Sequence, residues 1–112
     1  MKKDPKIFLK HILESIDEIE KYIKRFSKGD FLKDRKTQDA VVRRIEIIGE
    51  AVKNLPADYK KKHKEIKWRE IAGMRDILTH EYFGIDLNIV WRTVKKDIPQ
   101  LKKKVFGLLK KC

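Results

Sequence analysis

Four residues that could transfer protons or bind phosphate lie close together, at Arg75, Asp76, His80 and Tyr82. Cleavage of RNA by internal attack of a 2′-hydroxyl needs a proton acceptor, a proton donor and a cation near the phosphate. Histidine titrates near neutral pH and can serve in either proton transfer. Arginine holds phosphate through paired hydrogen bonds and stabilises the charge of the transition state. The segment therefore suits RNA cleavage without a metal, with Asp76 orienting His80 and favouring its protonated form.

The spacing of these residues limits how they can meet on a helix. At about 100° per residue, Arg75 and Tyr82 lie within about 20° of each other, and Asp76 can touch His80. Arg75 and His80 are about 140° apart, so one straight helix does not direct both at a single point. Either the helix loosens here, or a second chain completes the site. The spacing alone arises often by chance in a basic chain, and no cluster of His and Cys has the spacing of metal ligands.

Apolar residues recur at helical spacing along nearly the whole chain, and no segment alternates with period two. The pattern predicts helices from Pro5, capped by Asp4, to a stop at Gly29; from a cap at Thr37 to Leu55, before Pro56; from Trp68 to a stop at Gly84; and from a cap at Asp86 onward. Residues 57–67 are polar and allow one short helical turn. Pro99 predicts a kink or a new start, followed by a tail with apolar positions over 101–109. We expect an all-α, up-and-down bundle of four main helices with a fifth short or kinked piece.

Length and composition favour one small domain over residues 1–112. A single Cys excludes an internal disulfide, and no stretch approaches the 18 apolar residues that would indicate a membrane span. The residues after the N-terminal Met form no apolar signal-peptide core, so a cytoplasmic location is expected.

The net charge of +12 is distributed unevenly. From Arg92 to Cys112 there are eight Lys and Arg residues against one Asp, which leaves +7 in the last 21 residues. A solvated helix face would explain this charge, and so would a surface that attracts phosphate backbones. Charge alone does not decide between the two for the Lys-rich tail at 101–112.

One segment carries a family resemblance that its spacing alone does not. The run from Trp68 to Asp86, WREIAGMRDILTHEYFGID, resembles the HepT-like ribonuclease toxins of the HEPN superfamily. Residues 89–91 (IVW), 44–51 (RIEIIGEA) and 55–59 (LPADY) are similar to that family as well. The resemblance extends from the first helix to about Leu101, and the Lys-rich tail adds little to it.

The resemblance implies a helical homodimer in which two copies of the motif face a shared cleft. The family signature is an Arg, four to six residues and a His, here Arg75 and His80, with Asp76 as the polar residue after the Arg. The implied activity is that of a metal-independent endoribonuclease without a cofactor, the toxin of a type II toxin–antitoxin pair. The implied partner is an MNT-type nucleotidyltransferase antitoxin that uses ATP and Mg. In some members it transfers AMP to a tyrosine two residues past the His, here Tyr82.

Two other functions stay open at this point. The protein could be a non-catalytic adaptor that presents a substrate to a nucleotidyltransferase, or a basic bundle that binds nucleic acid without cutting it. Among the other polar candidates, His11 and His63 are expected at the surface and Glu50 as a solvated or interface carboxylate. Trp68 and Trp91 are expected to anchor the core or an interface.

Overall fold

The structure, a computed structural model, describes residues 4–79 and 86–111, and over residues 75–79 it describes the backbone alone. Every element in these two ranges is a helix, so the predicted all-helical class is confirmed. In order they are α1 (Pro5–Ile23), α2 (Lys28–Lys33), α3 (Arg35–Asn54), α4 (Ala57–Lys62), α5 (Trp68–Thr79), α6 (Leu87–Arg92), the π-helix η1 (Thr93–Asp97) and α7 (Ile98–Lys111). None of the described helices is long and apolar enough to cross a membrane.

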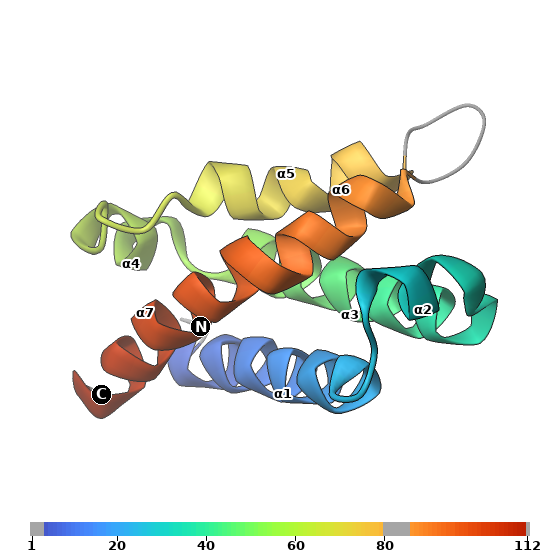
Figure 1. The fold of residues 1–112 in the computed structure, drawn as a ribbon. Coiled ribbons are helices and arrows are strands. Elements are labelled where there is room, and N and C mark those ends of the chain that lie inside the picture. The colour runs from blue at the N-terminus through green and yellow to red at the C-terminus, as the bar shows by residue number, and fades with distance from the viewer. Residues whose placement is uncertain (1–3, 80–85, 112) are drawn as a thin grey trace.

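The central helix of the fold is α3, which packs against α1 and α5. Figure 1 shows α5 and α1 on either side of α3, with α7 crossing α1 and ending at the opposite end of the molecule from α6. The short helix α2 lies against α3 and α6. The chain thus joins four long helical segments through short ones. α5 packs against α3, whereas α6, the next described helix, packs against α2.

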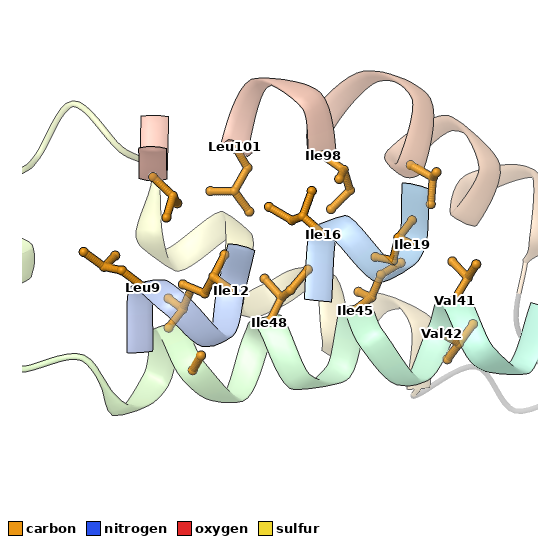
Figure 2. Packing of buried hydrophobic residues seen from close by; sticks show 14 of the residues in the cluster. Leu9, Ile12, Ile16, Ile19, Val41, Val42, Ile45, Ile48, Ile98 and Leu101 are labelled. Atoms are coloured by element: carbon orange, nitrogen blue, oxygen red, sulfur yellow. The ribbon is translucent and has the colours of Figure 1, made fainter. Parts of the chain in front are cut away.

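The core consists of the apolar stripes that the sequence pattern predicts. Figure 2 shows side chains of α1, α3 and α7 meeting in this core. The largest side chains that are almost completely buried in the described part of the chain are Phe31, Leu9, Ile12, Ile16, Ile19, Ile45, Ile48, Ile98, Val41, Val52, Val90 and Val105. β-Branched residues dominate this set, and close packing makes each one costly to truncate.

The first helix ends earlier than predicted. It stops at Ile23, and Ser27 starts the separate helix α2 through a capping box. The Asp30 amide donates to Ser27 Oγ at 3.1 Å, and the Ser27 amide donates to Asp30 Oδ2 at 3.0 Å. The hydrogen bond from the Ser27 amide, and then one from the Ser27 side chain, hold the pKa of Asp30 below its usual value. The capping box gives hydrogen-bond partners to the amides of both Ser27 and Asp30. A new helix start is therefore more favourable here than continuing α1 to Gly29.

The start of the next helix was also predicted wrongly. Asp34, not Thr37, is the N-cap of α3, because its Oδ1 accepts a hydrogen bond from the Thr37 amide at 3.1 Å. The caps predicted at Asp4 and Asp86 are confirmed by hydrogen bonds from the amides of Lys6 and Asn88, both at 3.0 Å. A carboxylate accepts backbone hydrogen bonds well at a helix start, where the amides lack partners.

The irregularity predicted near Pro99 takes the form of a π-helix. Proline has no backbone N–H, so a regular helix cannot form the hydrogen bond that would end on Lys95. The amide of Ile98 instead donates to the carbonyl of Thr93, five residues back. The chain therefore continues from α6 through η1 into α7, and only one turn is widened.

One polar group in the core makes no hydrogen bond. Ser15 of α1 is 1% exposed, and its Oγ has no hydrogen-bond partner. A buried hydroxyl without a partner destabilises the fold, so we expect Ser15→Ala to raise the free energy of unfolding by about 1 kcal/mol. The same change at Ser27 removes the capping box and should lower it by about 1 kcal/mol. Urea denaturation checks both, and a loss of stability in Ser15→Ala would contradict the prediction.

Candidate functional site

The motif begins on α5, whose last two turns carry Arg75 and Asp76. The structure places the backbone of both residues on this helix, as the sequence predicts. His80 and Tyr82 lie outside the described residues, and so does the stop predicted at Gly84. The meeting of Arg75, Asp76, His80 and Tyr82 in one site therefore stays a prediction.

The start of α5 is fixed by a buried tryptophan. Trp68 is 7% exposed, and its indole Nε1 donates to the carbonyl of His63 at 3.1 Å. The preceding Ile66 is buried beside it, and α5 then packs along α3. The prediction that Trp68 anchors the core is confirmed. This anchor determines how far along α3 the helix reaches, and so where Arg75 lies.

The chain after the motif is held by a different contact. Asp86 caps α6, and the half-buried Trp91 lies against Phe31 of α2 with 5.3 Å between ring centroids. The ammonium of Lys95 lies 5.4 Å from the centroid of Trp91. The ends of α5 and α6 share one end of the molecule in Figure 1. The two helices that flank the motif thus pack against different elements, α5 against α3 and α6 against α2.

A groove of about 580 Å³ lies between α5 and α7, and the part of its lining that the structure describes reaches Met74, the residue before Arg75. Its apolar lining comes from Ile66, Ile71, Met74 and Leu101, and its charged residues are Lys67, Glu70, Asp97 and Lys104. A Cβ added to Gly73 in this groove would meet no atom within 4 Å. The sequence analysis missed this groove, because its residues belong to two stripes far apart in the chain.

The remaining histidines belong to other parts of the fold. His11 is exposed on α1. His63 precedes α5, where its Nδ1 lies 3.5 Å from Glu65 Oε1 and its ring 4.6 Å from that of Tyr59. Glu50 is exposed on α3. Within 4–79 and 86–111, no three side chains of His, Cys, Asp or Glu are grouped so that they could hold a metal ion.

The comparison with protein families decides what kind of protein carries this motif. The sequence model of the family described as "Ribonuclease HepT-like" matches residues 12–106. The chain belongs to the HepT-like ribonuclease family. The match spans every described helix from α1 into α7, and it ends before the last residues of α7.

Relatives of nearly the same length support the family assignment. "Probable ribonuclease HepT" of Thermococcus cleftensis is 53% identical over 98% of this chain and its own whole length. "Putative RNase TTE0752" of Caldanaerobacter subterraneus subsp. tengcongensis is 49% identical over 97% of each chain. A Methanocaldococcus jannaschii protein, "Gamma-glutamylcyclotransferase and putative RNase MJ0434", is 54% identical over 97% of this chain. The chain spans about half the length of that relative, 49%. No solved structure matches.

Proposed function

We propose that this HepT-like protein is a metal-independent endoribonuclease that acts as the toxin of a type II toxin–antitoxin pair. The observation that carries the proposal is the complete motif Arg75-x4-His80-x-Tyr82 in a chain of the HepT-like ribonuclease family. The names of the relatives, which refer to RNase and ribonuclease HepT, support the same reaction. The position of Arg75 and Asp76 in the last turns of α5 is compatible with a site at the end of that helix.

In the proposed reaction the 2′-oxygen of a ribose attacks the adjacent phosphorus. The new bond joins the 2′-oxygen to phosphorus, the bond from phosphorus to the 5′-oxygen breaks, and the products are a 2′,3′-cyclic phosphate and a 5′-hydroxyl. His80 takes the proton of the 2′-hydroxyl as general base, and His80 of the partner subunit gives a proton to the leaving 5′-oxygen. Arg75 binds the non-bridging phosphate oxygens and stabilises their growing charge, and Asp76 positions His80.

A homodimer follows from the need for two proton-transfer groups at one phosphate. One chain offers a single His in the motif, and Arg75 and His80 point about 140° apart on an ideal helix. Two copies facing each other across a cleft would supply two His and two Arg side chains to the same RNA. The dimer would also bring +24 of formal charge to the substrate, since each chain carries +12.

The proposed partner is an MNT-type nucleotidyltransferase encoded beside this chain, which uses ATP and Mg to transfer AMP to the hydroxyl of Tyr82. The new bond joins the tyrosine oxygen to the α-phosphorus of ATP, and pyrophosphate leaves. The attached nucleotide is anionic and bulky, and it lies two residues from His80. It would exclude RNA from the cleft by charge and by volume.

Expression with and without the transferase tests the proposal. The chain alone should arrest growth, whereas co-expression should restore growth and add the mass of one or more AMP groups at Tyr82. The Tyr82→Phe chain lacks the acceptor oxygen and should keep its unmodified mass, and intact-mass spectrometry with peptide mapping distinguishes these outcomes.

A different result of the same experiment would show that the protein is an adaptor and not a toxin. A chain that is harmless alone, yet binds the transferase tightly and gains no mass, would be a substrate-presenting subunit. Growth restored without any gain in mass would leave the toxin in place and limit the antitoxin to binding.

A further inference from the structure

The basic tail divides into one lysine that forms ion pairs and four that form none with the described part of the chain. Lys102 Nζ donates to Glu20 Oε1 at 2.6 Å and lies 3.5 Å from Asp17 Oδ1, both on α1. The hydrogen bond to Glu20, and then the charges of Glu20 and Asp17, raise the pKa of Lys102. Lys102 therefore joins α7 to α1, and its charge is already balanced within the fold.

The other four lysines surround a glycine on the exposed side of α7. Lys103, Lys104, Lys110 and Lys111 lie four and three residues before and three and four residues after Gly107. Residues at these spacings are direct neighbours on a helix surface. All four are exposed, and none forms an ion pair with another residue in the described part of the chain. We call Gly107 and these four lysines, with Phe106, the tail patch.

The centre of the tail patch is open. A Cβ added to Gly107 would meet no atom within 4 Å apart from those of its chain neighbours and its own helix, so no side chain from elsewhere in the described chain lies directly over Gly107. Glycine destabilises the interior of a helix relative to alanine, and no neighbouring atom in the described structure requires it here. A compact anion could approach the helix surface at this point and contact lysines on both sides.

An exposed aromatic ring borders the same surface. Phe106 is 52% exposed, and the ammonium of Lys110 lies 5.0 Å from the centroid of its ring. Proteins that hold single-stranded nucleic acid combine lysines along the backbone with aromatic rings on which bases stack. An acidic protein surface would satisfy the lysines, but it would give an exposed phenyl ring no specific partner.

The tail patch begins at the groove that Lys104 shares with Met74, and from there it extends to the C-terminal end of α7. The chain is helical without a break from Leu87 to Lys111, and 25 residues at about 1.5 Å each extend roughly 37 Å. The whole molecule measures 44 Å along its longest axis. α6 follows the motif segment, and α7 ends at the opposite end of the molecule (Figure 1). Half of the tail patch, namely Gly107, Lys110 and Lys111, lies beyond the family match, which ends at residue 106.

We propose that the tail patch is a second RNA-binding site, which holds the phosphate backbone of single-stranded RNA at a distance from the cleavage site. A phosphate would lie over Gly107 among the four lysines, with a base against Phe106. The identity of the polyanion rests on the proposed ribonuclease function. Because the tail patch extends to the far end of α7, it contributes fully to binding only when the RNA is long enough to reach both Lys111 and Arg75, so it gives the enzyme a preference for long RNA.

Substitutions of Gly107 give the sharpest test, because both keep the helix. Gly107→Glu places a carboxylate at the centre of the tail patch, whereas Gly107→Ala adds one methyl group. In the His80→Ala protein, which should not cut, we expect Gly107→Glu to raise the Kd for a fluorescent 20-nucleotide RNA by at least about tenfold at low salt, and Gly107→Ala by less than about twofold. Fluorescence anisotropy measures both.

A second set of four lysines serves as a control that separates the effect of a local binding site from the effect of net charge. Replacing the four lysines of the tail patch by Ala, or Lys61, Lys62, Lys64 and Lys67 by Ala, lowers the net charge equally, from +12 to +8. The first variant should lose affinity and reduce the slope of log Kd against log salt by about 0.7 for each phosphate contact removed. The second should change little. Equal losses in both variants would overturn the proposal, since they would reflect net charge alone.

Cleavage assays distinguish failure of the tail patch from failure of the proposed nuclease. In the active protein, Gly107→Glu should raise KM for a long RNA and leave kcat/KM for a short oligonucleotide unchanged. Normal cleavage and binding of long RNA by Gly107→Glu would overturn the tail patch and leave the nuclease standing. If the parent protein cuts no RNA but Gly107→Glu still lowers its affinity for RNA, the proposed nuclease would be overturned and the tail patch would stand. Unchanged RNA binding with loss of a co-purifying protein would assign the tail patch to a protein partner and overturn the RNA proposal.

Discussion

His80→Ala should lower the rate of RNA cleavage by about 10²- to 10⁴-fold, the usual contribution of a general acid or base. In the proposed dimer the substitution removes the groups for both proton transfers, so the loss should lie near the upper end of that range. Arg75 would still bind phosphate, and the KM for RNA should change much less than kcat. The measurement is a time course with a defined RNA in EDTA, which also tests whether cleavage needs a divalent metal.

The chain supplies two controls for this experiment. His11→Ala removes an exposed histidine of α1, and His63→Ala removes one that contacts Glu65 and Tyr59 ahead of α5. Both should cleave RNA within a few-fold of the parent. A His80→Ala protein as fast as the parent would remove His80 from the mechanism. Activity lost only in EDTA would make the reaction metal-dependent instead.

Ile16→Ala should destabilise the fold by about 2–5 kcal/mol, as is usual for a fully buried aliphatic side chain. Ile16 is 0% exposed and belongs to the cluster in which α1, α3 and α7 meet (Figure 2). The substitution removes apolar contacts and leaves a cavity at the centre of three helices. Urea denaturation followed by circular dichroism at 222 nm measures the change.

A second isoleucine of the same helix is the control for this prediction. Ile7 is 52% exposed, so Ile7→Ala removes little buried surface and should change the free energy of unfolding by less than about 0.5 kcal/mol. Similar losses in the two variants would mean that Ile7 is covered in the native assembly. A loss below about 1 kcal/mol for Ile16→Ala would show that the core rearranges to fill the cavity.

The sequence predicted the helices but not all of their ends. Stripes such as Ile12 to Ile23 identify the buried face, because burial dominates the free energy of packing an amphipathic helix. Helix ends depend on single hydrogen bonds, and here the bonds of Ser27 and Asp34 decided against the predicted continuation to Gly29 and the predicted start at Thr37. Such caps contribute about 1 kcal/mol each, and several candidates compete here, because Ser27, Asp34 and Thr37 lie within eleven residues of one another.

The candidate site was predictable only as a motif on one chain. The run around Arg75 identified the family, and the structure places the first part of that run on α5. The groove between α5 and α7 and the open position at Gly107 depend on how distant or neighbouring residues lie in space. Apolar spacing assigns Ile71 and Leu101 to two separate stripes and gives no sign that they border one groove.

The π-helix η1 has a consequence for the alignment of the whole C-terminal half. Val90, Val94 and Ile98 are buried at two successive intervals of four residues, and in a regular α-helix each such interval would turn the apolar face about 40° further around the axis. The wider turn absorbs this drift and acts as a one-residue phase correction between α6 and α7. Leu101, Val105 and Leu108 then continue the same buried seam. The outward direction of Gly107 and its four lysines depends on that correction, because a shift in phase would turn them toward the core.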